Sequence, residues 1–178
     1  MSELNDKLLG VLPGKSKISR FRPVAYIVPP LLAILFQIYV PRFASYLSYL
    51  ELPLLVTVYF ALMRRQPVAG AVIGCLIGLA QDALSQHPLG MQGIVKTLVG
   101  YFAASISMRF DVENVALRFI LSFFFFVFHQ LFLWVQGRGL HGMSMDLQAP
   151  QTIIFAFLNA VVAAPLFLVL DRLKSEEL

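Results

Sequence analysis

The stretch GAVIGCLIGLAQDALSQHPLGMQGIVKTLVG, residues 70–100, contains two apolar segments joined by a short polar turn. In the first segment, glycines recur every four residues, which places them on one helix face, and Asp82 falls at the next step of that face. In the second segment, Lys96 shares a helix face with Gly93 and Gly100. The pattern predicts a transmembrane helical hairpin with a charge on each small-residue face. The glycines expected to pack against a helix, or to bind a partner, are Gly70, Gly74, Gly78, Gly90, Gly93 and Gly100.

The composition places the chain in a lipid bilayer. Of its 178 residues, 58% are hydrophobic and 13% are charged, and the mean hydropathy is +0.76, which is too apolar for an ordinary soluble domain. The formal net charge is +4, but the basic residues are scattered at the ends of apolar segments. No nucleic-acid partner is therefore expected. The single cysteine, Cys75, lies inside an apolar segment and predicts neither an intrachain disulfide nor a cysteine metal site.

The length of the apolar segments predicts an all-α membrane protein, a six-helix bundle. A membrane-spanning helix needs about 20 mostly apolar residues. The short connections indicate one membrane domain over 24–170, preceded by a polar segment at 1–23 and followed by a tail at 171–178. Pro29 and Pro30 fall in the first turns of the first helix and could kink it. The predicted helices are 24–40, 46–63, 67–84, 90–108, 115–136 and 150–170, and 137–149 is predicted to be a loop.

The distribution of lysine and arginine predicts the orientation. If the N-terminus lies in the cytoplasm, eleven basic residues fall on the cytoplasmic side and three on the outer side. This asymmetry favours cytoplasmic termini and an outward-facing turn at 82–90. The eleven are Lys7, Lys15, Lys17, Arg20, Arg22, Arg64, Arg65, Arg109, Arg118, Arg172 and Lys174, and the three are Arg42, Lys96 and Arg138.

Three charged residues fall at similar depth near the outer ends of their helices: Glu51, Asp82 and Lys96. A charge in hydrocarbon costs several kcal/mol unless it is paired or hydrated, so such residues usually face the bundle interior or a wet cavity. We therefore expect a polar cleft that opens outward. Three other interpretations remain open: Asp82 and Lys96 pair and hold the hairpin, Asp82 caps its own turn, or Lys96 extends to the headgroups.

The sequence predicts no enzyme. No Ser/His/Asp order, HExxH, GxSxG or phosphate-loop motif is present, so no catalytic residues are assigned. The three histidines, His87, His129 and His141, are not spaced for a metal site, and neither a metal nor a cofactor is expected. His129 beside Gln130 is expected to form hydrogen bonds between helices.

Several motifs resemble the MreD family of rod-shape-determining membrane proteins. They are GLAQDAL at 78–84, HPLG at 87–90 and the Gly100–Tyr101 pair. Weaker similarity lies in LPLLVTVYFAL at 52–62 and in the ending, where Pro165 is followed by DRLK at 171–174. The chain departs from the family where an acidic residue often follows the proline of the second helix. Here Leu54 follows Pro53, and the acidic residue is Glu51.

The resemblance implies a non-enzymatic subunit of the bacterial cell-elongation machinery in the inner membrane. Such a subunit binds MreC and works beside MreB, RodA and a class B penicillin-binding protein in cell-shape maintenance and peptidoglycan synthesis, with membrane lipid around it. The family is also similar in fold to the S components of energy-coupling-factor vitamin transporters. That similarity gives an alternative function, in which the outer cleft holds a small ligand instead of a protein segment. The hairpin motif favours the first function.

Overall fold

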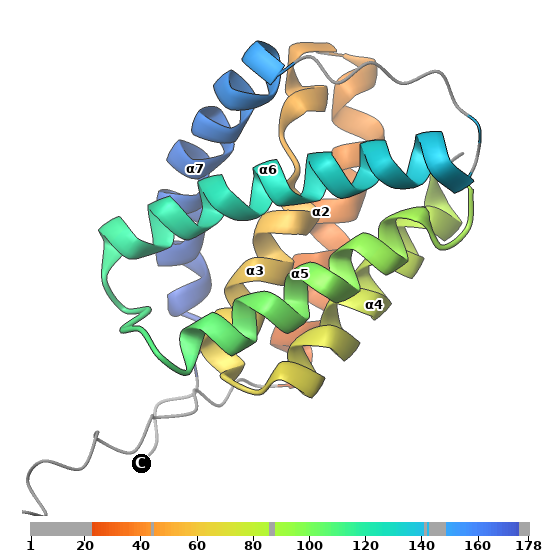
Figure 1. Ribbon diagram of the computed structural model, residues 1–178. Coiled ribbons are helices and arrows are strands. Elements are labelled where there is room, and N and C mark those ends of the chain that lie inside the picture. Colours follow the sequence, from red (N-terminus) through yellow and green to blue (C-terminus); the bar gives the residue numbers. More distant parts are fainter. Residues whose placement is uncertain (1–22, 44, 86–87, 141, 143–148, 175–178) are drawn as a thin grey trace, which may run out of the picture.

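A computed structural model describes residues 23–43, 45–85, 88–140, 142 and 149–174. Figure 1 shows an all-helical bundle in which α6 crosses in front of α3. The α-helices are α2 (Val28–Tyr39), α3 (Leu52–Arg64), α4 (Pro67–Leu84), α5 (Met91–Ser107), α6 (Val115–Leu140) and α7 (Ala149–Asp171). Short 3-10 helices are η1 (Pro23–Tyr26), η2 (Val40–Arg42) and η3 (Ser45–Tyr49).

Five helical segments of the described residues are long and apolar enough to cross a membrane. The remaining long helix, α5, has only 17 residues and carries Lys96. The all-helical membrane architecture predicted from the sequence is therefore confirmed, whereas the count of six spans stays a prediction. The five segments are Val24–Arg42, Leu47–Arg64, Pro67–Leu84, Val115–Gly139 and Ala149–Asp171.

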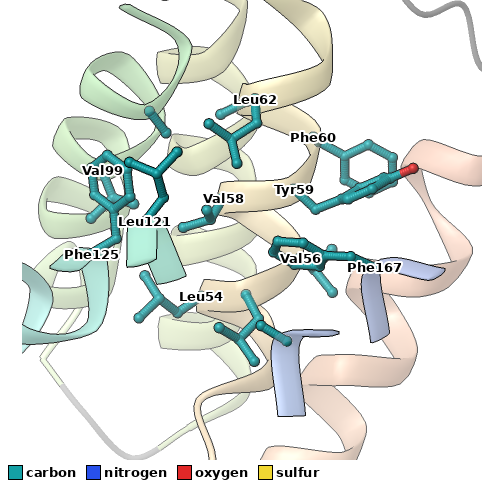
Figure 2. Close-up of a cluster of buried hydrophobic side chains, with 14 of the residues drawn as sticks. Leu54, Val56, Val58, Tyr59, Phe60, Leu62, Val99, Leu121, Phe125 and Phe167 are labelled. Atoms are coloured by element: carbon teal, nitrogen blue, oxygen red, sulfur yellow. The ribbon is translucent and has the colours of Figure 1, made fainter. Parts of the chain in front are cut away.

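Helix α3 lies at the centre of the bundle. Every residue from Pro53 to Met63 is buried, which is typical of a helix that is apolar on all faces. It contacts α2, α4, α5, α6 and α7. Figure 2 shows Val58 of α3 on the side of Val99 and Phe125, whereas Tyr59 points to the opposite side. The other helices are thus arranged around α3.

The second predicted helix differs most from the structure. It was expected over 46–63, but α3 begins at Leu52, and Ser45–Tyr49 forms the separate 3-10 helix η3. Glu51 has φ −95° and ψ 65°, outside the helical region. Pro53 lies in the first turn of α3, where its missing N–H and fixed φ suit a helix start better than a helix interior. The predicted helix is therefore broken before α3.

Asn159 of α7 satisfies the backbone at this break. Its Oδ1 accepts a hydrogen bond from the Glu51 N–H (2.9 Å), and its Nδ2 donates to the Tyr49 carbonyl (2.8 Å). Inside a membrane protein, non-helical backbone needs such internal partners. The fully buried Asn159 therefore joins α7 to the start of α3.

Two other helix ends also differ from the prediction. Pro29 and Pro30 occupy the first positions of α2, after a short 3-10 helix, so they start the α-helix. Helix α6 continues to Leu140 instead of ending at 136, and so includes part of the predicted loop. Its extension contains Gly137 and Gly139, which weaken a helix but do not forbid one. His141 and residues 143–148 of that loop lie outside the described residues.

Candidate functional site

Helices α4 and α5 form the most extensive helix contact of the described residues, and their backbones meet through glycine. A Cβ built on Gly78 would lie 2.5 Å from the Gln92 carbonyl oxygen and 2.6 Å from the Gly93 Cα. Real Cβ atoms do not approach backbone so closely, so any side chain here would force the helices apart. The two small-residue faces therefore pack against each other within the chain. The other facing pairs are Gly70 with Gly100, and Gly74 with the backbone of Lys96.

Gly90 has a different reason to be glycine. A Cβ on it would meet nothing within 4 Å, so it does not share the close packing expected for it within the chain. Its φ is +94°, a conformation that residues with a Cβ rarely adopt. Gly90 therefore sets the turn that leads into α5.

Asp82 binds the N-terminus of α5. Its Oδ2 accepts hydrogen bonds from the N–H groups of Gly90 (2.9 Å) and Gly93 (3.0 Å), and its Oδ1 accepts one from the Gln92 N–H (3.0 Å). The first N–H groups of a helix have no partner within the helix, and the partial positive charge there favours a carboxylate. The geometry thus matches the interpretation that Asp82 caps its own hairpin turn.

Lys96 bonds to a glutamine side chain and lies beside a histidine ring. Its Nζ donates to Gln92 Oε1 (2.6 Å) and lies 3.4 Å from His129 Nε2, and that histidine nitrogen lies 3.0 Å from Gln92 Oε1. The side chains of Gln92, Lys96 and His129, with the Asp82 carboxylate, form what we call the turn-end cluster. It joins α5 to α6 and lies where α4 ends and α5 begins.

Asp82 and Lys96 do not form the ion pair that the sequence suggested. Among the described residues, the ion pairs within 4 Å involve Asp171 and not Lys96. Both carboxylate oxygens of Asp82 instead accept hydrogen bonds from backbone N–H groups at the start of α5. Lys96 donates to the side-chain amide oxygen of Gln92, one helical turn earlier in α5. Among the described residues, Glu51 likewise forms no ion pair with Lys96.

The predicted outward-opening cleft is an enclosed cluster in this structure. Asp82 is 1% exposed, and Lys96 and His129 are fully buried, so Lys96 does not extend to the headgroups. A polar side chain can be enclosed when backbone or amide groups hydrogen-bond to it, because these bonds replace its bonds to water. Glu51 is only partly buried, and its Oε2 has no hydrogen-bond partner among the described residues. His87 lies outside them.

The sequence interpretation missed Gln92, which bonds to both Lys96 and His129. Its signal was the spacing of four residues before Lys96, because positions i and i+4 are neighbours on a helix. Gln92 is buried and is therefore part of the interior.

A second polar cluster at the opposite end of the bundle was also missed. Arg118 Nη1 lies 2.6 Å from Asp171 Oδ2, and the Tyr59 hydroxyl donates to Asp171 Oδ1 (2.8 Å). Lys174 Nζ lies 2.8 Å from the same Oδ1, and Arg118 Nε donates to the Val112 carbonyl (2.6 Å). This Asp171 cluster joins α3, α6 and α7. Only the Asp171–Lys174 spacing was visible in the sequence.

The polar side chains at this site hold helices together. The described residues contain no group of three or more His, Cys, Asp or Glu side chains placed to hold a metal. Cys75 is a half-buried free thiol. The polar side chains of the turn-end cluster bond to each other and to the α5 backbone, which fixes helix positions.

Comparison with protein families matches residues 18–173 to the family described as rod shape-determining protein MreD. The match includes every described helix. Neither the curated proteins nor the solved structures gave a match. The resemblance drawn from the hairpin motifs is thereby confirmed, and the chain is a multi-pass membrane protein that determines shape in the cell-elongation system. This chain belongs to the MreD family.

Proposed function

We propose that the chain is a non-enzymatic subunit of the elongation machinery that binds MreC. Through that complex it works with MreB, RodA and a class B penicillin-binding protein in peptidoglycan synthesis. It lies in the inner membrane with both termini in the cytoplasm, so the turn between α4 and α5 faces outward. The family match supports the shape-determining role, and the basic-residue asymmetry supports the orientation.

The observation that carries this proposal is the start of α5, which Asp82 fixes to the end of α4. Asp82 holds the backbone of Gly90, Gln92 and Gly93, and Leu89 beside it is 79% exposed. A large apolar side chain on a pre-organised backbone suits protein binding, because little conformational entropy is lost when the partner docks. Leu89 is therefore the proposed contact with MreC.

The alternative, a substrate-binding transport subunit, would need an accessible cavity lined by the predicted polar residues. Asp82 and Lys96 are instead enclosed and bonded within the chain. This geometry favours a role in which the buried polar groups hold the helices in place and do not bind a small ligand. The MreD family match favours the same role.

The test is copurification of MreC with Leu89→Arg. We expect MreC recovery to fall at least about fivefold while the melting temperature in detergent stays unchanged, since loss of a buried apolar contact is worth roughly 1.5–3 kcal/mol. The matched control is Met108→Arg, which changes an exposed apolar residue just beyond the other end of α5. Equal MreC recovery with both variants would contradict the proposed contact.

A further inference from the structure

A groove lies on the surface between η1, the end of α3 and the part of α4 from Ala69 to Ile77. Its volume is about 400 Å³, within the range of small-ligand sites. Val72 and Leu76 on its α4 side are exposed, so the groove faces the surroundings of the bundle. Its lining residues are Tyr26, Arg64, Ala69, Val72, Ile73, Leu76 and Ile77.

One end of the groove is positively charged. The Arg64 Cζ lies 5.8 Å from the centre of the Tyr26 ring, which orients the guanidinium beside the groove. No acidic group of the described residues lies within 4 Å of Arg64 to neutralise it. Arg65 follows directly and adds a second positive charge. This end therefore suits an anionic group.

The rest of the groove is apolar and has the length of a lipid chain segment. From Ala69 to Ile77, α4 rises about 12 Å, which approaches half of a hydrocarbon core of about 30 Å. The groove thus extends from the level of Arg64, at a helix end, toward the middle of the bilayer. Charge and apolar surface are arranged in the same order as in a phospholipid.

We propose that this groove binds an anionic phospholipid, with its phosphate on Arg64 and one acyl chain along Val72, Ile73 and Leu76. A basic pocket between transmembrane helices is a recognised arrangement for lipid headgroups. A partner's transmembrane helix fits less well, because close helix contacts need small residues, whereas branched side chains form these walls. The proposal does not depend on MreC binding.

The test is native mass spectrometry of the full chain in detergent with equimolar phosphatidylglycerol and phosphatidylcholine. We expect the wild type to retain phosphatidylglycerol preferentially. Arg64→Gln should weaken that retention about fivefold, the effect of roughly 1 kcal/mol for one basic residue near a membrane surface. Val72→Trp should fill the groove and reduce the retention of both lipids.

Two control variants match these changes in type, and the valine control also matches in exposure. Arg109→Gln removes an exposed arginine away from the groove, and Val169→Trp enlarges an exposed valine on α7. Both should retain phosphatidylglycerol like the wild type. Equal retention of the two lipids by the wild type, or equal loss in Arg64→Gln and Arg109→Gln, would overturn the proposal. Equal protection against thermal unfolding by inorganic phosphate and by phosphatidylglycerol would overturn it too.

Discussion

The α4–α5 and α6–α7 pairs are held together in different ways. Between α4 and α5, glycines allow backbone contact, and the Asp82 carboxylate binds backbone N–H groups. Between α6 and α7, side chains meet, as in the edge-on contact of Phe119 with Phe157, whose ring centres are 5.6 Å apart, and half of the buried residues of α7 are alanines. Arg118 and Asp171 then form an ion pair. One pair is joined through its backbone and the other through its side chains.

The difference shows how a carboxylate can be accommodated at two depths of burial. Asp82 is enclosed and has no cation within 4 Å among the described residues, so the N-terminus of α5 supplies the positive potential. The Asp171 side chain is 25% exposed and is paired with Arg118 and Lys174. Because lipid gives helices little hydrophobic drive to associate, both arrangements hold helices by contacts that hydrocarbon tails cannot replace.

The largest effect is expected when the backbone contact is opened. Gly74→Leu places a side chain against the Lys96 backbone, which cannot move as a flexible side chain could. Overpacking usually costs 1–3 kcal/mol, and we expect a loss of more than about 3 kcal/mol here because α5 itself must shift. Purification yield and thermal unfolding in detergent measure this loss.

The control is Gly139→Leu in α6, where a Cβ would meet nothing within 4 Å. It should leave the melting temperature close to that of the wild type. If Gly74→Leu were as stable as this control, α4 and α5 would not be in close backbone contact. The contrast between the two helix pairs would then not hold.

An intermediate effect is expected when the two carboxylates are neutralised. In Asp82→Asn, one oxygen becomes an NH₂ group that cannot accept, which leaves at least one buried N–H group unpaired and removes the charge favoured at the α5 N-terminus. We expect a loss of about 2–3 kcal/mol. Asp171→Asn should lose less, about 1–2 kcal/mol, because the Asp171 side chain is 25% exposed and Arg118 keeps its hydrogen bond to the Val112 carbonyl. Thermal unfolding of both variants, with Asp111→Asn as an exposed control, makes the comparison; a larger loss at Asp171 would contradict it.

The sequence predicted the parts of the fold that depend on local spacing. The four-residue glycine repeat located the face of α4 that contacts α5, because helix geometry alone puts Gly70, Gly74 and Gly78 on one side. The apolar segments located the helices. The break before α3 was missed, because hydropathy does not register a non-helical backbone that Asn159, 108 residues later, can satisfy.

For the candidate site, the sequence placed Asp82 and Lys96 near the turn but did not predict their bonding. Asp82 and Lys96 are both buried near the turn, yet sequence alone treats two nearby opposite charges as a pair. It does not show that the α5 N–H groups bind Asp82, or that the Gln92 amide oxygen binds Lys96. The Asp171 cluster was missed for a related reason, since Arg118 and Asp171 are 53 residues apart and meet only when α6 packs on α7.

The smallest expected effect is the coupling between Asp82 and Lys96, and it tests whether the α4–α5 pair contains an ion pair after all. Because the two side chains bond to different atoms of Gln92 and not to each other, the stability losses of Asp82→Asn and Lys96→Met should be coupled by less than about 1 kcal/mol. A second cycle with Gln92→Leu and Lys96→Met should instead show coupling of about 1 kcal/mol or more, since these residues share a 2.6 Å hydrogen bond. Both cycles are measured as thermal stability in detergent. Strong coupling of Asp82 to Lys96 without coupling of Gln92 to Lys96 would mean that the carboxylate pairs with the lysine, and both helix pairs would then be held by ion pairs.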